Sequence, residues 1–419
     1  MATYLSPINV HHNMDFNVDK IREDFPLLAQ KVHGYPIVYF DNGATTQKPR
    51  QVIETIRKYY EQGNASVHRG VHFLSEQSTE IYEESREKVR RYINAASASE
   101  IIFTSGTTGS INALAFSFGE KYLGPGTEVI ITEMEHHSNL VPWQMACERK
   151  SAKLKVVPFN DKGELEIASL KKLFSEKTRI MALTHISNSL GTINPVREIV
   201  RLAHSHDIPV LVDGAQALPH ERIDVQDLDA DFYAFSGHKV YGPNGIGVLY
   251  GKEKWLYDLP PYQGGGDMVD CVTFEKTTYN ELPLKFEAGT MNYIGAAGLA
   301  TALDYISGIG LEKIKEYEQH LLEYATMKLM TVPGLQIYGN AASKVSILSF
   351  LLDGIHPYDA GMVLDKLGIA VRTGTHCTQP VMDHFRITGT LRASLAMYNT
   401  TEEIDRLHAG LHRVREMFG

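Results

Sequence analysis

The stretch Val210-Leu211-Val212-Asp213-Gly214-Ala215-Gln216 decides the fold class of this chain. Its apolar run does not alternate with polar residues, which is typical of a strand that is covered on both faces of a parallel sheet. The run ends abruptly on the carboxylate of Asp213. Ligands of open α/β sheets bind beyond the carboxyl ends of the strands, so we expect Asp213 to face a binding site.

Similar apolar runs recur between residues 37 and 250 and alternate with amphipathic helical stretches such as Thr79–Asn94 and Val196–Ser205. This alternation predicts an α/β domain with a mostly parallel sheet. The predicted strands are Ile37–Phe40, Glu100–Phe103, Glu128–Thr132, Leu154–Pro158, Arg179–Thr184, Pro209–Asp213, Asp231–Phe235 and Ile246–Tyr250.

The length of 419 residues exceeds what one small core usually organises, so we expect two domains. Residues 30–305 are predicted to form a large domain and residues 306–419 a smaller α+β domain. The helical segment 18–29 is expected to join the small domain, and residues 1–17 to form a polar extension.

Within these domains, an irregular excursion is predicted from Gly264 to about Pro283, followed by a helix that begins at Tyr293. The small domain is expected to hold long helices, short strands such as Val345–Phe350, and a terminal helix from Thr401.

Composition excludes several classes of protein. The net charge of −9 and the scattered basic residues argue against a nucleic-acid surface. No apolar run approaches the roughly 18 residues of a membrane span, and we detect no secretory signal. The three cysteines, Cys147, Cys271 and Cys377, lack metal-ligand spacing, so we expect no metal site and a reduced, cytoplasmic setting.

The stretch Ser236-Gly237-His238-Lys239 places a lysine among small residues and donors that suit a phosphate. A lysine that forms a Schiff base and an acid that pairs with a pyridinium nitrogen are the two groups that pyridoxal phosphate (PLP) chemistry requires. Asp213 suits the second role, because a lone buried carboxylate is costly unless it is paired. Alone, Lys239 could be a solvated turn residue and Asp213 a structural ion pair. Together they predict a PLP enzyme.

Two further segments follow predicted strands. Thr104-Ser105-Gly106-Thr107-Thr108-Gly109 opens a helix and could cradle an anion, or could be an ordinary capped helix. It lacks the lysine of a nucleoside triphosphate loop. In Glu135-His136-His137-Ser138-Asn139, adjacent histidines point in different directions, which argues against a metal. His136 could stack on a planar cofactor, or could be a satisfied turn histidine.

A nucleophilic cysteine is predicted in Arg372-Thr373-Gly374-Thr375-His376-Cys377-Thr378-Gln379-Pro380, whose composition indicates an exposed loop. Arg372 and His376 are neighbours that could favour the thiolate of Cys377, as cations or through hydrogen bonds. Cys147 lies in an apolar helical context, and we interpret it as structural. We interpret Cys271 as structural too.

Taken together, these segments resemble the SufS-type (group II) cysteine desulfurases, within class V of the PLP-dependent aminotransferases. The resemblance covers nearly the whole chain. It is carried by Asp41-Asn42-Gly43-Ala44-Thr45-Thr46-Gln47-Lys48-Pro49, Val67-His68-Arg69-Gly70, Met134-Glu135-His136-His137, Val212-Asp213-Gly214-Ala215-Gln216, Phe235-Ser236-Gly237-His238-Lys239, Phe286-Glu287-Ala288-Gly289-Thr290 and Arg392-Ala393-Ser394-Leu395.

The resemblance implies PLP-dependent transferase fold type I, a homodimer, and a set of contacts to the cofactor. Lys239 would carry the Schiff base, Asp213 would pair with the pyridine nitrogen, and Gln216 would donate to the ring oxygen. His136 would stack on the ring and take part in catalysis. The residues implied for the phosphate are Thr107, Thr108, Ser236 and His238, with Thr290 reaching the phosphate of the other subunit.

The resemblance also implies the reaction. Asn188 and Arg392 would bind the substrate carboxylate, with Arg372 as a further substrate residue, and Cys377 would accept the sulfur. L-cysteine would give L-alanine and an enzyme persulfide, which a SufE- or SufU-type acceptor would receive for iron–sulfur cluster assembly.

The chain departs from the family loop, which commonly places His and Ala where Thr375 and Thr378 stand here. The two threonines bear on the reactivity of the Cys377 thiolate and on the surface that would contact a sulfur-acceptor protein. Three other functions stay open: selenocysteine lyase or cysteine sulfinate desulfinase, an aminotransferase or decarboxylase that does not use Cys377, and an idle scaffold.

Overall fold

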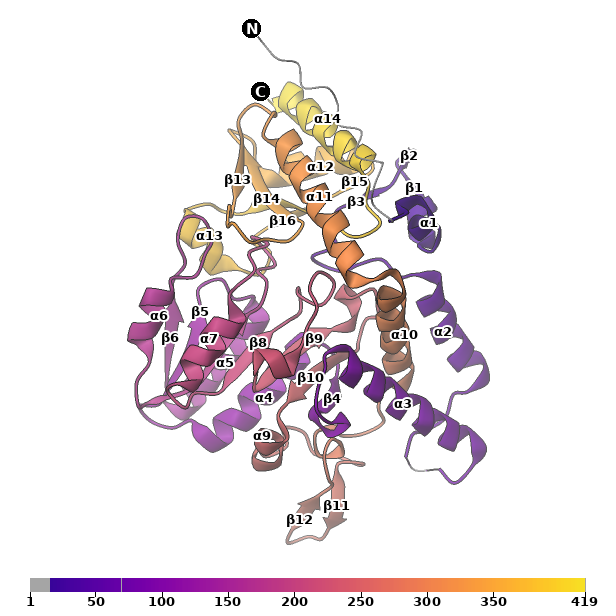
Figure 1. Ribbon diagram of the computed structural model, residues 1–419, viewed down its shortest axis with the longest axis vertical. Helices are drawn as coiled ribbons and strands as arrows, with labels where there is room; N and C mark the ends of the chain where they lie inside the picture. The colour runs from indigo at the N-terminus through magenta and orange to yellow at the C-terminus, as the bar shows by residue number, and fades with distance from the viewer. Residues whose placement is uncertain (1–15, 69, 419) are drawn as a thin grey trace.

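The computed structural model describes residues 16–68 and 70–418. Most of the predicted extension 1–17 therefore lies outside the described residues. A large sheet with its helices occupies the lower part of Figure 1, and a smaller sheet with helices of its own lies above it.

The large sheet has seven strands in the order β4-β10-β9-β8-β7-β5-β6. The pairings from β9 to β6 are all parallel, whereas β10 is antiparallel to both of its neighbours. The prediction of an α/β fold with a mostly parallel sheet is confirmed. The strands are Ile101–Thr104 (β4), Glu128–Thr132 (β5), Lys153–Val157 (β6), Thr178–Thr184 (β7), Val210–Asp213 (β8), Phe232–Ser236 (β9) and Gly247–Gly251 (β10).

Strands β5, β8, β9 and β10 are buried along their whole length, which explains their continuous apolar runs. On β8, Val212 belongs to one hydrophobic cluster and Leu211 to another, because neighbouring side chains point to opposite faces. The helices that connect or cover the strands are Arg50–Gln62 (α2), Phe73–Tyr92 (α3), Thr107–Tyr122 (α4), His137–Lys150 (α5), Ile167–Leu173 (α6), Val196–His204 (α7), Val225–Leu228 (α8), Glu253–Asp258 (α9) and Tyr293–Ile309 (α10).

The prediction for the helix Thr79–Asn94 is wrong at its start. Helix α3 begins at Phe73, because the ring of His72 accepts a hydrogen bond from Ser75 N and caps the helix. Histidine is not among the usual capping residues, so the pattern of the sequence hid this start.

The second sheet is antiparallel, in the order β13-β14-β17-β16. Its strands are Leu335–Tyr338 (β13), Ile347–Leu352 (β14), Arg372–Gly374 (β16) and Thr390–Ser394 (β17). The accompanying helices are Leu311–Leu329 (α11), Pro357–Lys366 (α12), Gln379–Phe385 (α13) and Thr401–Phe418 (α14). Most of these elements share a hydrophobic cluster of their own.

Strand β3 (Val38–Tyr39) corrects the prediction that Ile37–Phe40 belongs to the large sheet. It pairs in parallel with β15 (Ile369–Ala370), far away in the sequence. Val38 and Phe40 are fully buried in the cluster of the C-terminal elements. A short apolar run indicates burial but does not say which sheet receives it.

The segment after Gly264 also differs from the prediction of an irregular excursion. It contains a hairpin of β11 (Val269–Val272) and β12 (Thr277–Tyr279), which projects from the large-sheet part at the bottom of Figure 1. Cys271 is exposed on this hairpin, so its interpretation as a structural cysteine is wrong. Most of the hairpin is exposed and lacks the buried face on which strand patterns depend.

The N-terminal segment forms helix α1 (Val18–Glu23) and the 3₁₀ turn Pro26–Ala29. It contacts both parts of the chain: Phe25 is buried against Tyr241 and Tyr398, and Arg22 pairs with Glu403 at 2.9 Å. A small hairpin of β1 (Lys31–Val32) and β2 (Tyr35–Pro36) follows. Among the described residues no single helix could cross a membrane, although α10 and α11 together, as a bent pair, have the length and composition for it.

Candidate active site

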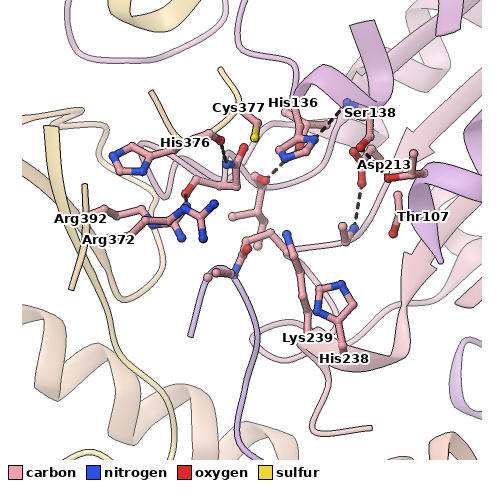
Figure 2. A pocket seen from close by; sticks show the side chains of 18 residues that line it. Thr107, His136, Ser138, Asp213, His238, Lys239, Arg372, His376, Cys377 and Arg392 are labelled. Carbon is pink, nitrogen blue, oxygen red and sulfur yellow. Dashed lines mark hydrogen bonds between the residues drawn. The ribbon is translucent and has the colours of Figure 1, made fainter. Parts of the chain in front are cut away.

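A cavity of about 180 Å³ lies where the large sheet meets the C-terminal elements. Figure 2 shows Lys239 reaching into it from one side, the two arginines and His376 on another, and Thr107 and Asp213 opposite the arginines. The predicted site residues that line it are Thr107, Thr108, His136, Asn188, Asp213, Gln216, His238, Lys239, Arg372, Cys377 and Arg392.

Asp213 and Lys239 come from adjacent strands. Asp213 ends β8, is buried, and accepts a hydrogen bond from Ala215 N at 2.9 Å. Burial raises the pKa of its carboxyl, which Lys239 partly opposes. Lys239 ends the 3₁₀ turn that follows β9, and burial lowers the pKa of its amine to about 8, against the attraction of Asp213. A fraction of this amine is therefore uncharged near neutral pH, as a nucleophile or base requires.

The start of helix α4 forms a cradle of hydroxyl groups beside these two residues. Thr107 donates its N–H to Ser236 Oγ at 2.8 Å, and the two hydroxyl oxygens are also 2.8 Å apart. The hydroxyls of Thr108 and Ser138 are 2.7 Å apart. Helix N-termini attract anions, so the cradle suits a phosphate group.

The backbone packs tightly behind this cradle. A Cβ atom at Gly247 would lie 2.4 Å from Gly106 Cα, and Gly106 has a φ of 142°. Only glycine tolerates both constraints, which lets strand β10 approach the turn before α4.

His136 is an uncharged aromatic side chain at the N-cap of α5. Its Nδ1 accepts a hydrogen bond from Ser138 N at 3.0 Å. Burial, followed by the positive charge of Lys239, lowers the pKa of the imidazole to about 3. A neutral ring suits stacking on a planar ligand better than it suits a charged contact.

The two arginines converge on Asp41, which follows strand β3. Arg392 is buried and lies 3.2 Å from Asp41, while Arg372 lies 3.6 Å from the same carboxylate. Arg392 also donates to the carbonyl oxygen of Asn188 at 2.8 Å. Burial lowers the pKa of Arg392 to about 10, so it stays charged at neutral pH and can attract an anion.

The loop that carries Cys377 is held in place on several sides. His137 N donates to the Cys377 carbonyl at 2.8 Å, and the Asn188 amide donates to the His376 carbonyl at 2.9 Å. His376 and Cys377 both have φ near +55°, a conformation that non-glycine residues rarely adopt. Such strain persists only where surrounding contacts fix it, and it is common at functional sites. The Cys377 side chain is partly exposed.

From the sequence, His376 could be a cation beside the thiolate of Cys377, but its imidazole is neutral. It is buried, its Nε2 lies 2.8 Å from the hydroxyl of Thr390, and burial lowers its pKa to about 2. The other cysteines differ from Cys377: Cys147 is buried and its pKa is raised to about 11 by burial, as a structural thiol requires.

Two predicted residues lie apart from the cavity lining. Ser236 is buried behind Thr107, which it contacts through its hydroxyl. Thr290 is exposed and does not line the cavity. It could therefore contact only a phosphate that is bound to another molecule of the protein. The cofactor and substrate roles of all these residues stay predictions.

Sequence reasoning missed Asp41 and Ser138. Both stand in segments that we quoted, but a carboxylate after a strand and a serine in a capping position are common in proteins. Only the structure shows that Asp41 lies beside Arg392 and Ser138 beside Thr108. No group of three or more potential metal ligands occurs among residues 16–68 and 70–418.

A comparison with models of protein families shows to which family the chain belongs. A model of the class-V aminotransferases matches residues 38–407. The chain belongs to this family. The predicted membership and the predicted fold are thus confirmed, whereas the SufS type within the class-V aminotransferases stays a prediction.

Individual class-V relatives agree with this result. A protein of Shigella sonnei (strain Ss046) named cysteine desulfurase is 51% identical over 407 residues, covering 97% of this chain and all of the relative. The structure of the cysteine desulfurase CsdA of Escherichia coli matches with a TM-score of 0.90 at 38% identity, covering 96% of this chain and 100% of that one. A cysteine desulfurase of Thermococcus onnurineus NA1 matches with a TM-score of 0.89 at 37% identity, covering 97% and 98%.

Proposed function

We propose that this protein is a PLP-dependent cysteine desulfurase that converts L-cysteine to L-alanine and keeps the sulfur as a persulfide on Cys377. One observation carries the proposal: Cys377, Lys239 and Arg392 line a single cavity. The relatives and solved structures named cysteine desulfurase support the same activity.

The residues present fit PLP. Three buried polar atoms on the cavity lining have no hydrogen-bond partner among the described residues: Gln216 Oε1, His376 Nδ1 and Arg392 Nε. Buried polar atoms are normally satisfied, so these orphans indicate a polar ligand. Lys239 would hold the cofactor, Asp213 would face its ring nitrogen, His136 its ring, and Thr107 and Thr108 its phosphate. When bound, PLP supplies an electron-accepting ring that makes the substrate Cα proton acidic.

The arginines of the cavity account for substrate binding. A guanidinium presents parallel N–H donors that match a carboxylate, so Arg392 can fix the carboxylate of L-cysteine. Asp41 already holds Arg392 and Arg372 in place, which reduces the ordering that substrate must impose. Lys239 Nζ, with its lowered pKa, then accepts the proton from Cα.

Sulfur transfer falls to Cys377. Its thiolate attacks the substrate sulfur, an S–S bond forms, and the bond between the substrate sulfur and Cβ breaks with its electron pair left on the carbon. Protonation of that carbon, together with the return of a proton from Lys239 to Cα, gives L-alanine, and Cys377 keeps the added sulfur. Because His376 is neutral, the positive groups that line the cavity together with Cys377 are Lys239, Arg372 and Arg392.

Other parts of the proposal concern the setting of the enzyme. Three free cysteines support a reduced, cytoplasmic location. Thr290, exposed and outside the cavity lining, is available to a second subunit, which supports a homodimer. The partly exposed Cys377 supports delivery to an acceptor of the SufE or SufU type. L-selenocysteine is a second candidate substrate.

The deciding experiment is mass spectrometry of the PLP-loaded protein after incubation with L-cysteine. We expect one added sulfur on the peptide that contains Cys377, together with stoichiometric L-alanine. Cys147→Ser serves as the matched control and should gain the same sulfur. A keto acid or an amine as the product, with neither L-alanine nor added sulfur on Cys377, would instead favour an aminotransferase or decarboxylase.

A further inference from the structure

Behind the cavity, Gln216 is linked to two residues that the mechanism does not use. Gln216 Nε2 lies 3.5 Å from Nε2 of His220. The hydrogen bonds from His220 N and Glu221 N to the carbonyl of Ala217 form a helical turn here. Residues four positions apart share one side of such a turn, so the local backbone brings these two side chains together.

The link continues to helix α11. His220 Nδ1 lies 2.5 Å from Glu318 Oε2, and the hydroxyl of Ser346 donates to the same oxygen at 3.4 Å. His220, Glu318 and Ser346 are all buried, at 5%, 3% and 1% exposure. A buried, hydrogen-bonded chain of this kind has few alternative arrangements, so it can fix the orientation of its last member.

The donors and acceptors in the series Gln216, His220 and Glu318 can be assigned from the atoms that face one another. The amide nitrogen of Gln216 can only donate, so Nε2 of His220 is the acceptor in their contact. The ring proton then lies on Nδ1 of His220, which donates to the carboxylate oxygen of Glu318. The amide cannot flip without placing its carbonyl oxygen against that acceptor.

We propose that His220 and Glu318 are positioning residues that orient the amide of Gln216, so that its second N–H faces the ring oxygen of PLP. This inference rests on the proposed function, because it assigns the amide to the bound cofactor. If His220 and Glu318 only stabilised the packing of the turn against α11, replacing them would leave the absorbance spectrum of bound PLP unchanged.

The test is a double-mutant cycle on the purified protein, read by the absorbance spectrum of bound PLP and by titration of the cofactor-free protein with PLP. Gln216→Leu should shift the absorbance maximum and weaken PLP binding. His220→Leu should shift it in the same direction and weaken binding by roughly two- to tenfold, the worth of one hydrogen bond. In the Gln216→Leu background, His220→Leu should add less than about twofold.

Conservative variants separate positioning from folding. His220→Gln keeps an acceptor near the Nε2 position and Glu318→Gln keeps an acceptor for Nδ1, so both should restore the parent spectrum, while Glu318→Leu should behave like His220→Leu. Gln319→Ala, an exposed neighbour on the same helix, is the control and should match the parent. Melting temperatures of the cofactor-free variants verify folding.

The results distinguish the two levels of the proposal. If Gln216→Leu shifts the spectrum but neither His220→Leu nor Glu318→Leu does, or if the effects add fully in the double variant, the positioning role is overturned and the enzyme assignment stands. If the parent protein binds no PLP, the proposed function fails as well.

Discussion

At the scale of single residues, Lys239 is the group on which the proposed chemistry depends. Lys239→Ala should abolish L-alanine production and leave PLP bound only non-covalently, because the variant lacks the amine that attaches the cofactor and moves the proton. Borohydride reduction followed by peptide mapping should find the pyridoxyl group on Lys239 in the parent. Its appearance on Lys48, another lysine with a pKa lowered by burial, would contradict the assignment.

Cys377 separates desulfuration from other PLP reactions. Cys377→Ser should keep its PLP content and its affinity for L-cysteine, since neither binding step uses the thiol. It should release L-alanine on the order of a thousandfold more slowly, because the variant lacks the thiol that attacks the substrate sulfur. Cys147→Ser should keep parent activity, because Cys147 is buried away from the cavity. We expect L-selenocysteine turnover to suffer less, since its C–Se bond is weaker. Parent-level activity of Cys377→Ser on L-cysteine would rule out the persulfide route.

Arg392 is expected to recognise the substrate carboxylate. Arg392→Lys keeps the charge but loses the fork of donors, so the apparent KM for L-cysteine should rise by roughly ten- to hundredfold at unchanged PLP content. Steady-state kinetics of alanine formation measure this. Arg90→Lys, in helix α3 and outside the cavity lining, is the control. An unaltered KM would assign Arg392 to structure, through its contacts with Asp41 and Asn188.

At the scale of elements, the cradle at the start of α4 depends on the close approach of β10. Gly247→Ala should push Gly106 away and lower the stability of the cofactor-free protein by about 1–3 kcal/mol, the usual cost of overpacking. PLP affinity should fall with it, because the same turn carries Thr107. Urea unfolding and PLP titration measure both. Gly124→Ala, whose Cβ would meet no atom within 4 Å, should leave both unchanged.

The elements also show what sequence alone can give. Buried parallel strands such as β8 were predictable, because a covered strand needs an uninterrupted apolar run. The pairing of β3 with β15 was not, since two residues carry too little pattern to identify a distant partner. The site followed the same rule. Asp213, at the end of β8, and Lys239, in the turn after β9, were predictable from their motifs. The contact of Asp41 with Arg392 was not, because it joins residues that are far apart in the sequence.

At the scale of the whole molecule, buried ionisable groups couple stability to pH. The pKa of Lys239 is about 8 in the folded protein and about 10.4 in an unfolded chain, so between these values the unfolded state binds more protons. Stability of the cofactor-free protein should therefore gain from this residue as pH rises from 8 to 10.4, by at most about 1.4 kcal/mol per pH unit. Lys239→Met should lose this contribution. Urea unfolding of both proteins at several pH values measures the difference, and equal slopes would contradict the burial of the amine.

The pairing of β3 with β15 has a consequence for how the chain is made. Val38 and Phe40 leave the ribosome early, but the strand and the cluster that bury them are synthesised near the end of translation. Until then these apolar side chains have no native partner, and Asp41 cannot meet Arg392. Folding of the large sheet can begin during synthesis, whereas the catalytic cavity can close only after the last strands have emerged. A nascent chain stalled before residue 369 should therefore present a formed sheet, with Lys239 in the turn after β9, and an incomplete substrate pocket.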